Sequence, residues 1–176
     1  MSELFSIQLQ NRQQQGRDGV WLDLPTTTEQ VQAALRQIGI SSDNPQGLFV
    51  SGYFAEEEKR FAIPYNMVLA SNVDELNFLA ARLETLSAGE RAELNAALQA
   101  PQSELSSIGR TTDFPENVEY YVHLPDVRGP AQLGDYYLNR SGMVNMPEEW
   151  KGGIDTAQFG RYVAQQEQGA FTQYGY

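Results

Sequence analysis

The feature that most constrains the fold is a leucine stripe in the middle of the chain. Leu76, Leu79, Leu83 and Leu86 recur every three or four residues, which places them on one face of an α-helix. Asn72 stands just before the stripe, and asparagine is a favoured N-cap residue. Because a helix with one apolar face must bury it against a neighbour, this stripe predicts the core of a helical region.

A second helix is predicted directly after the first. Ser87 and Glu90 have the spacing of a capping box, in which each side chain bonds the backbone N–H of the other residue. Pro101 ends this helix because proline disfavours helical geometry in the residue before it. The two helices together predict a helical middle subdomain over residues 66–109.

The segment before this region combines strand and helix patterns. Three short runs are rich in β-branched and aromatic residues, and the first alternates apolar with polar positions. Between the second and third runs, residues 26–39 have helical periodicity, with Thr26 and Glu29 spaced as a capping box. We therefore expect an N-terminal α+β subdomain over residues 1–65. Its predicted strands cover residues 5–10, 17–25 and 46–55.

The last segment, residues 110–176, is predicted to return to α+β structure. Its expected elements are a strand over 118–124, a helix over 130–142, a helical turn over 147–150, a helix capped by Asp155 and a closing strand over 170–176. The expected fold class is α+β: an elongated chain of three small subdomains, α+β, helical and α+β, with small antiparallel sheets.

Charge is the strongest signal in the composition. Among 176 residues, 23 Asp and Glu oppose 12 Lys and Arg, giving a net charge of −11. The acids are spread along the chain and do not form one acidic tail. A field of this sign repels nucleic acid and anionic membranes and attracts basic protein surfaces. Solubility alone is the competing explanation for such a charge.

The sequence lacks the side chains and motifs of common enzyme classes. Cysteine is absent and His123 is the only histidine, so thiolate zinc sites and a two-histidine metal site are excluded. Glycine-rich phosphate loops and the nucleophile elbow are also absent. We expect no enzymatic activity, no cofactor and no metal. A hydrolase using paired acids such as Glu148 and Glu149 is the weakest hypothesis, since adjacent residues on a helical turn do not face each other.

Nothing in the sequence predicts a membrane association. No stretch approaches the roughly 20 apolar residues that a spanning helix needs. The beginning of the chain lacks the basic and apolar pattern of a secretory signal. The expected location is the cytoplasm.

The end of the chain resembles a known family. The run LGDYYLNRSGMVNMPEEWKGGIDTAQFGRYVAQQEQGAFTQYGY, residues 133–176, is similar to the C-terminal part of the ArdA-type antirestriction proteins. Residues 76–98 look like the middle helices of this family, and residues 19–25 look like its early strand. The matching C-terminal positions are Leu133, Gly134, Tyr137, Gly142, Pro147, Ile154, Asp155, Phe159, Gly160, Arg161, Gly169, Phe171, Thr172, Tyr174, Gly175 and Tyr176.

The resemblance implies a DNA mimic. Proteins of this family display carboxylates in place of phosphates, occupy the DNA groove of type I restriction–modification enzymes and do not bind nucleic acid themselves. The carboxylates expected to act as phosphate mimics here are Glu56, Glu57, Glu58, Asp74, Glu75, Glu84, Glu90, Glu93, Asp113, Glu116, Glu119, Asp126, Asp135, Glu148, Glu149, Asp155 and Glu167. The alternative is a regulatory module with the same fold that binds another basic, DNA-binding protein.

The resemblance also implies a homodimer formed through the C-terminal subdomain. The expected interface residues are Leu133, Tyr136, Tyr137, Leu138, Met143 and Val144. The chain departs from the family pattern at Thr156 and Gln158, where we expect acidic or aromatic residues.

Four features of the C-terminal region predict structural rather than binding roles. The aromatic residues of the final segment are expected to fill a core. Gly160 and Gly175 predict close packing or unusual backbone angles. Arg161, a base in an acidic protein, is expected to form an internal ion pair. His123 is expected to be a half-exposed strand residue.

Overall fold

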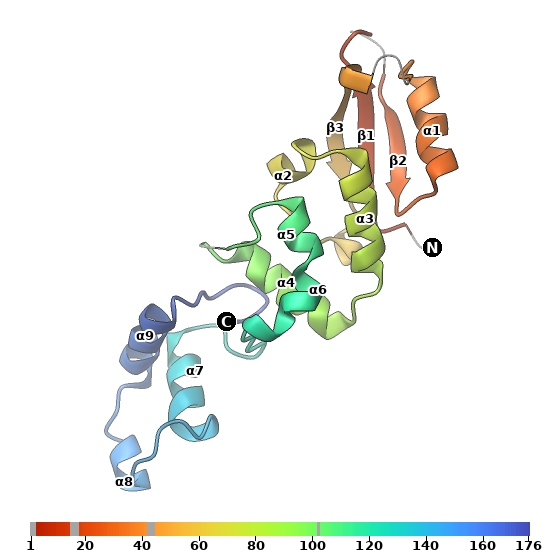
Figure 1. Ribbon diagram of the computed structural model, residues 1–176. Helices are drawn as coiled ribbons and strands as arrows, with labels where there is room; N and C mark the ends of the chain where they lie inside the picture. Colours follow the sequence, from red (N-terminus) through yellow and green to blue (C-terminus); the bar gives the residue numbers. More distant parts are fainter. Residues whose placement is uncertain (1–2, 15–17, 42–44, 102) are drawn as a thin grey trace. The chain divides into compact units, whose positions relative to one another are not determined.

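The computed structural model describes residues 3–14, 18–41, 45–101 and 103–176 (Figure 1). It confirms the α+β class: in these ranges the chain forms one three-stranded antiparallel sheet and the helices α1 to α9. The chain divides into two compact units. The first comprises residues 1–91 and 104–117, and the second comprises residues 92–103 and 118–176.

The sheet lies in the first unit and confirms all three predicted N-terminal strands. Its strand order is β2–β1–β3, and both pairings of the central strand are antiparallel. Alternation places Phe5, Ile7 and Leu9 on one buried face, each at most 3% exposed. Arg17, at the start of the predicted second strand, lies outside the described residues. The strands are β1 (Phe5–Asn11), β2 (Val20–Leu24) and β3 (Leu48–Phe54).

Helices of the first unit pack against this sheet. The first and third helices contact β2, and the second contacts β3 (Figure 1). The helices are α1 (Thr28–Gln37), α2 (Tyr65–Leu69), α3 (Val73–Glu84), α5 (Ile108–Thr112) and α6 (Phe114–Asn117), together with the start of α4 (Ala88–Gln99). Short 3₁₀ turns lie at Pro45–Gly47 and Glu57–Lys59.

The predicted capping box of α1 is displaced by one residue. The cap is Thr27, whose hydroxyl accepts from the backbone N–H of Gln30, and the Gln30 side chain accepts from the Thr27 N–H. The predicted cap, Thr26, is engaged elsewhere: its N–H donates to the side-chain oxygen of Asn77 in α3 at 2.7 Å. Because this contact holds Thr26 against α3, the helix begins one residue later.

The predicted middle helices are confirmed. In α3 the stripe residues Leu76, Leu79 and Leu83 are fully buried, so the apolar face forms a core as expected. Ser87 and Glu90 form the predicted capping box before α4: the Ser87 N–H donates to the Glu90 carboxylate at 2.8 Å, and the Glu90 N–H donates to the Ser87 hydroxyl at 3.3 Å.

The second unit contains the end of α4 and a set of short helices. A small core of Val127, Leu133 and Ala164 is covered by partly buried aromatic residues, including Phe171 and Tyr176. This placement confirms for Phe171 and Tyr176 the expectation that the aromatic residues of the tail fill a core. The elements are a 3₁₀ turn at Val118–Tyr120, α7 (Pro130–Asp135), a π-helical turn at Tyr136–Arg140, α8 (Glu148–Lys151) and α9 (Thr156–Glu167).

Two glycines allow α7 and α9 to pack with their backbones in contact. A Cβ atom added to Gly160 would lie 1.8 Å from the carbonyl oxygen of Pro130. One added to Gly134 would lie 1.9 Å from the carbonyl oxygen of Thr156. The predicted close packing at Gly160 is therefore confirmed, and the predicted unusual backbone at Gly175 is confirmed by its φ of 126°.

The two strands predicted for the C-terminal segment are wrong. The alternating residues 118–124 begin with a 3₁₀ turn, and Tyr120 and Val122 are more than three-quarters exposed. The final residues turn back at a single bridge between Thr172 and Gly175. Leu124 and Tyr176 exchange two backbone hydrogen bonds of 2.9 and 3.1 Å. With no neighbouring strand in the described residues to extend this pairing, alternation alone does not produce a sheet.

Two further expectations for single residues are wrong. Arg161 is exposed, and no acidic side chain of the described residues lies within ion-pair distance of it. His123 is half-buried, as expected, but it is not in a strand. Its Nε2 lies 2.9 Å from the Tyr174 carbonyl oxygen, so it connects the segment before α7 to the segment after α9.

Candidate partner-binding surface

The carboxylates expected to meet a partner all lie at the molecular surface. None is buried. The exposed ones are Glu56, Glu57, Glu58, Asp74, Glu75, Asp113, Glu116, Glu119, Asp126, Glu148, Glu149, Asp155 and Glu167. The half-buried ones are Glu84, Glu90, Glu93 and Asp135.

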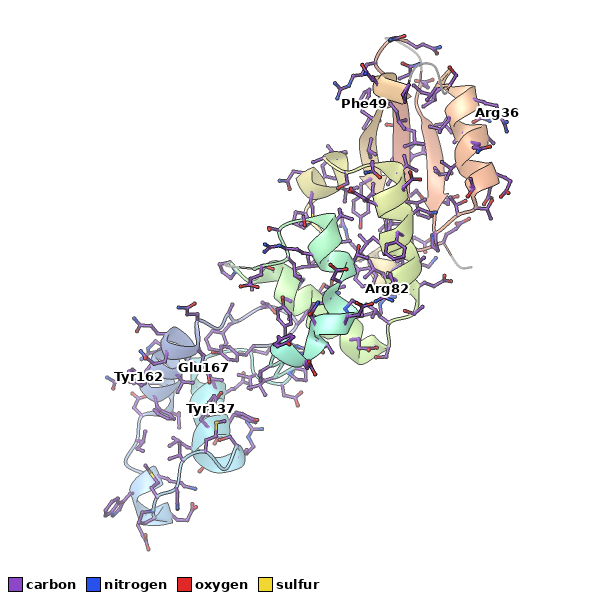
Figure 2. All side chains as sticks on the ribbon, in the orientation of Figure 1. Arg36, Phe49, Arg82, Tyr137, Tyr162 and Glu167 are labelled. Atoms are coloured by element: carbon purple, nitrogen blue, oxygen red, sulfur yellow. The ribbon has the colours of Figure 1, made fainter. Side chains whose placement is uncertain are left out.

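Some of these acids are paired with a base of the same chain. Arg82 and Glu116 are an example in the first unit, with Arg82 labelled in Figure 2. Such a pair offers a partner less net negative charge than a single acid does. The pairs and their N–O distances are Glu56–Lys59 at 2.9 Å, Glu116–Arg82 at 2.7 Å, Asp135–Arg140 at 3.2 Å and Glu148–Lys151 at 2.6 Å.

Other acids hold helix ends. Asp155 caps α9 by accepting from the Gln158 N–H at 3.0 Å. Glu90 accepts from the Ser87 hydroxyl and backbone N–H, and these bonds lower its pKa below the ordinary value. Neither residue is buried, so their structural role does not remove them from the acidic surface.

A further group of exposed acids forms no ion pair with any described residue. Asp74 and Glu75 lie in the first turn of α3, where the positive end of the helix dipole stabilises negative charge. This position favours two neighbouring carboxylates without a basic side chain beside them. The unpaired exposed acids are Glu57, Glu58, Asp74, Glu75, Asp113, Glu119, Asp126 and Glu149.

Glu167 has a structural role that the sequence did not indicate. One carboxylate oxygen accepts from the Tyr137 hydroxyl, and the other accepts from the Tyr176 hydroxyl at 3.0 Å. Figure 2 shows Tyr137 and Glu167 on neighbouring elements of the second unit. Glu167 thereby joins α9 to the π-helical turn and to the final residue of the chain.

The pKa values of both tyrosine hydroxyls are raised above the ordinary value. Partial burial, and then the hydrogen bond to Glu167 and its negative charge, raise the pKa of Tyr137 to about 12. The same causes raise the pKa of Tyr176 above its ordinary value. A pKa that is higher in the folded state favours folding at any pH below the ordinary tyrosine value of about 10.

We expect the free energy of unfolding to fall as pH rises from about 10 to about 12, because the folded protein must then lose protons that it holds more tightly than the unfolded chain. Urea unfolding at a series of alkaline pH values measures this dependence. In a Glu167→Gln variant the fall is expected to be smaller, since the neutral amide no longer disfavours tyrosinate. An unchanged pH dependence in that variant contradicts this role of Glu167.

The residues expected at a dimer interface are divided between core and surface. Leu133 and Leu138 are at most 3% exposed, so the fold of the single chain buries them. Tyr136 and Tyr137 are half-buried against the core of the second unit. Met143 is 76% exposed. Val144 is half-buried.

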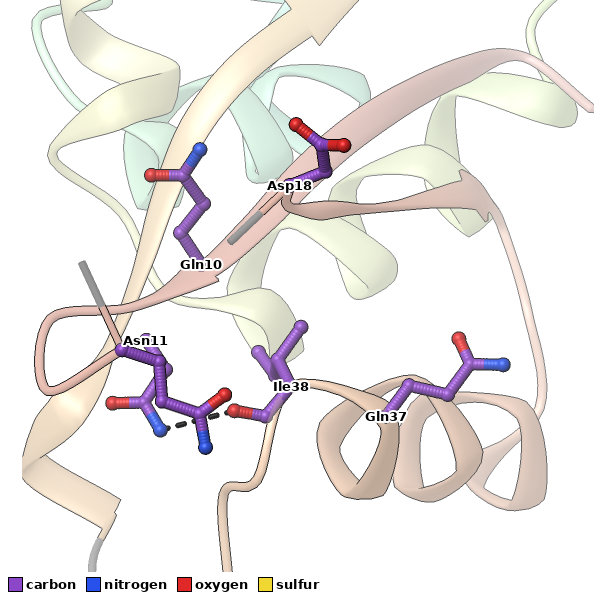
Figure 3. Close-up of a pocket in the computed structure, with 6 residues that line it drawn as sticks. Gln10, Asn11, Asp18, Gln37 and Ile38 are labelled. Carbon is purple, nitrogen blue, oxygen red and sulfur yellow. Dashed lines mark hydrogen bonds between the residues drawn. The ribbon is translucent and has the colours of Figure 1, made fainter. Parts of the chain in front are cut away.

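A small polar cavity lies in the first unit. Its volume is about 30 Å³, the size of a water site, and amide side chains line it (Figure 3). Asn11 lies at its edge and donates to the Ile38 carbonyl oxygen at 3.0 Å. The lining residues are Gln10, Asn11, Gln14, Asp18, Gln37 and Ile38. This set offers no nucleophile with an adjacent base.

Within the described ranges, no three histidine or acidic side chains come together as a metal site. In the same ranges, no helix is both long enough and apolar enough to cross a bilayer.

The fold and surface define an acidic α+β protein whose carboxylates are displayed along both of its units. A family model described as antirestriction protein (ArdA) matches residues 15–176. The chain belongs to the ArdA family of antirestriction proteins, as the resemblance of its C-terminal run predicted. No curated protein matches the chain.

Proposed function

We propose that this antirestriction protein acts as a B-DNA mimic that occupies the DNA-binding groove of a type I restriction–modification enzyme. The single observation that supports this most is the placement of the acids: every expected phosphate mimic lies at the surface, in both units. A groove that binds DNA must be basic, and complementary potential steers encounter and stabilises the complex.

The charge has the magnitude that such mimicry requires. B-DNA carries one negative charge for about every 1.7 Å of its axis. A dimer would carry twice the net charge of −11, which corresponds to the phosphates on roughly 37 Å of duplex. That length exceeds one turn of the double helix, the scale on which a recognition groove contacts DNA.

A cleavage assay tests this proposal. The protein is titrated into a type I enzyme acting on a plasmid with its recognition site, and the amount of cleaved plasmid is measured. We expect stoichiometric inhibition that weakens as salt increases, because the contacts replace those of phosphates. A folded protein that leaves cleavage unchanged at low salt contradicts the proposal and favours a regulatory module that binds another basic protein. Assaying methylation by the same enzyme shows whether modification is inhibited too.

We further propose a homodimer formed through residues 130–150. Met143 is the most exposed of the expected interface residues, so Met143→Glu should convert the dimer to a monomer without unfolding the chain. Light scattering measures the mass. Val122→Glu is the matched control, because Val122 is equally exposed in the same unit and lies outside the expected interface. A Met143→Glu protein that stays dimeric excludes Met143 from the interface.

A further inference from the structure

The sheet of the first unit has an open face that its helices do not bury. Side chains that alternate with the buried residues of β1 point to this face, and none of them is buried. The face carries an exposed tryptophan and an exposed phenylalanine. Its members are Ser6, Gln8 and Gln10 of β1, Trp21 and Asp23 of β2, and Phe49, Gly52 and Phe54 of β3.

Trp21 lies across this face. Gln8 of the central strand pairs with Trp21 on one side and with Gly52 on the other. A Cβ added to Gly52 would lie 3.1 Å from Cη2 of Trp21 and 3.1 Å from Cβ of Gln8. The indole therefore extends over the central strand to β3, where glycine leaves room for it. One side of the ring packs on the sheet, and the residue is still 51% exposed.

A carboxylate stands beside the indole. Asp23 lies two residues after Trp21 on the same strand, so both point to the same face, about 7 Å apart along the strand. The Ser6 hydroxyl donates to Oδ1 of Asp23 at 2.6 Å, which fixes the orientation of the carboxylate. Phe54, paired with Ser6 across the sheet and 59% exposed, extends the apolar area on the far side.

We propose that this face binds an arginine side chain of a basic partner. A guanidinium is planar, so it can stack on the exposed side of Trp21 and donate hydrogen bonds to Asp23. The net charge of −11 favours a cationic partner and disfavours a nucleic acid stacked on the same ring. An ammonium group lacks the planar surface, so arginine is preferred over lysine.

The fluorescence of Trp21 provides a direct test in the full-length chain. Trp150, in α8 of the second unit, is the only other tryptophan, so a Trp150→Phe background leaves Trp21 as the only tryptophan emitter. The probes are nona-arginine and nona-lysine peptides of equal charge. We expect nona-arginine to change the Trp21 emission and to bind roughly fivefold more tightly than nona-lysine.

Variants distinguish binding at this face from a general attraction between the acidic protein and a basic peptide. Trp21→Leu and Asp23→Asn, each followed by heteronuclear NMR of the same peptides, should lose the preference for arginine. Phe78→Leu is the matched control, since Phe78 is an exposed aromatic residue of α3 in the same unit. Circular dichroism establishes that each variant is folded. Equal affinity for both peptides, or an unchanged preference in the folded Asp23→Asn variant, overturns the inference.

The identity of the natural partner rests on the proposed function, but the peptide test does not. If the wild-type protein inhibits a type I enzyme and Trp21→Leu inhibits equally well, the open face is not used on that enzyme and the proposed function stands. If the wild type does not inhibit, the proposed function fails while the arginine preference is still measurable. The inference is also overturned if nona-arginine leaves the Trp21 emission unchanged while single-stranded DNA or self-association of the protein changes it.

Discussion

A Gly160→Val substitution is expected to destabilise the second unit by about 3 kcal/mol or more. The added side chain has no room between α7 and α9, so the two helices must move apart. The contact at Gly160 is with backbone: its added Cβ would lie 1.8 Å from the Pro130 carbonyl oxygen. A flexible side chain could rotate away, but the main chain of α7 cannot. Urea unfolding followed by circular dichroism measures the loss of free energy.

Gly89→Val is the matched control for this prediction. Gly89 is also helical, in α4, and an added Cβ meets nothing within 4 Å. The replacement is expected to be neutral or stabilising by up to ~0.5 kcal/mol, because most residues favour a helix more than glycine does. Equal stability of the Gly160→Val and Gly89→Val proteins would show that α7 and α9 do not pack through their glycines.

Neutralising six unpaired exposed acids together is expected to weaken inhibition by roughly 10²-fold, since an exposed charge contact contributes about two- to threefold in affinity. The change leaves the core untouched, because all six are surface residues. The inhibition constant for cleavage by a type I enzyme, measured at constant salt, gives the effect. The substitutions are Glu57→Gln, Glu58→Gln, Asp74→Asn, Glu75→Gln, Asp126→Asn and Glu149→Gln.

Exchanging aspartate and glutamate at the same six positions is the control, because it keeps the charge and changes only side-chain length. This protein should inhibit nearly as well as the wild type. The six single neutralisations should each have a small effect, as expected for distributed charge. If one of them abolishes inhibition in a folded protein while the others do nothing, the partner recognises a discrete site and not a charge pattern.

Local patterns predicted the first unit well, since its elements are specified by signals that lie within a few residues of each other. The leucine stripe of α3, its Asn72 cap and the Ser87–Glu90 capping box all form as expected. The capping box of α1 is displaced because Thr26 bonds Asn77, a residue 51 positions away. A contact of that range is set by the tertiary fold and leaves no local signal.

The second unit was predicted less completely. The alternation of Val118, Tyr120, Val122 and Leu124 indicated a strand, but a strand needs a neighbour to satisfy its backbone groups, and here only Leu124 pairs, with Tyr176. Gly160 of α9 gave a correct indication of close packing. Pattern alone could not show which helix Gly160 would meet.

The candidate surface was predictable as a class of residues but not in its detail. Excess acid predicted exposed carboxylates, and burying an unpaired charge is costly, so these residues stay at the surface. Which acids would pair with a base, or hold a helix or two tyrosines as Glu167 does, depends on tertiary contacts. The exposure of one side of Trp21 was not predicted from the sequence. The alternation of Trp21 with Val20 and Leu22 is the signal that could have placed it on the open face of the sheet.

Competition for the enzyme between this protein and DNA tests the central claim most directly. A fluorescently labelled duplex with the recognition site is bound to a type I enzyme, and the polarisation is followed as the protein is added. Mimicry predicts full displacement of the duplex, with an apparent affinity that falls as salt or unlabelled duplex increases. A stable complex that contains enzyme, duplex and this protein together would contradict occupation of the DNA groove.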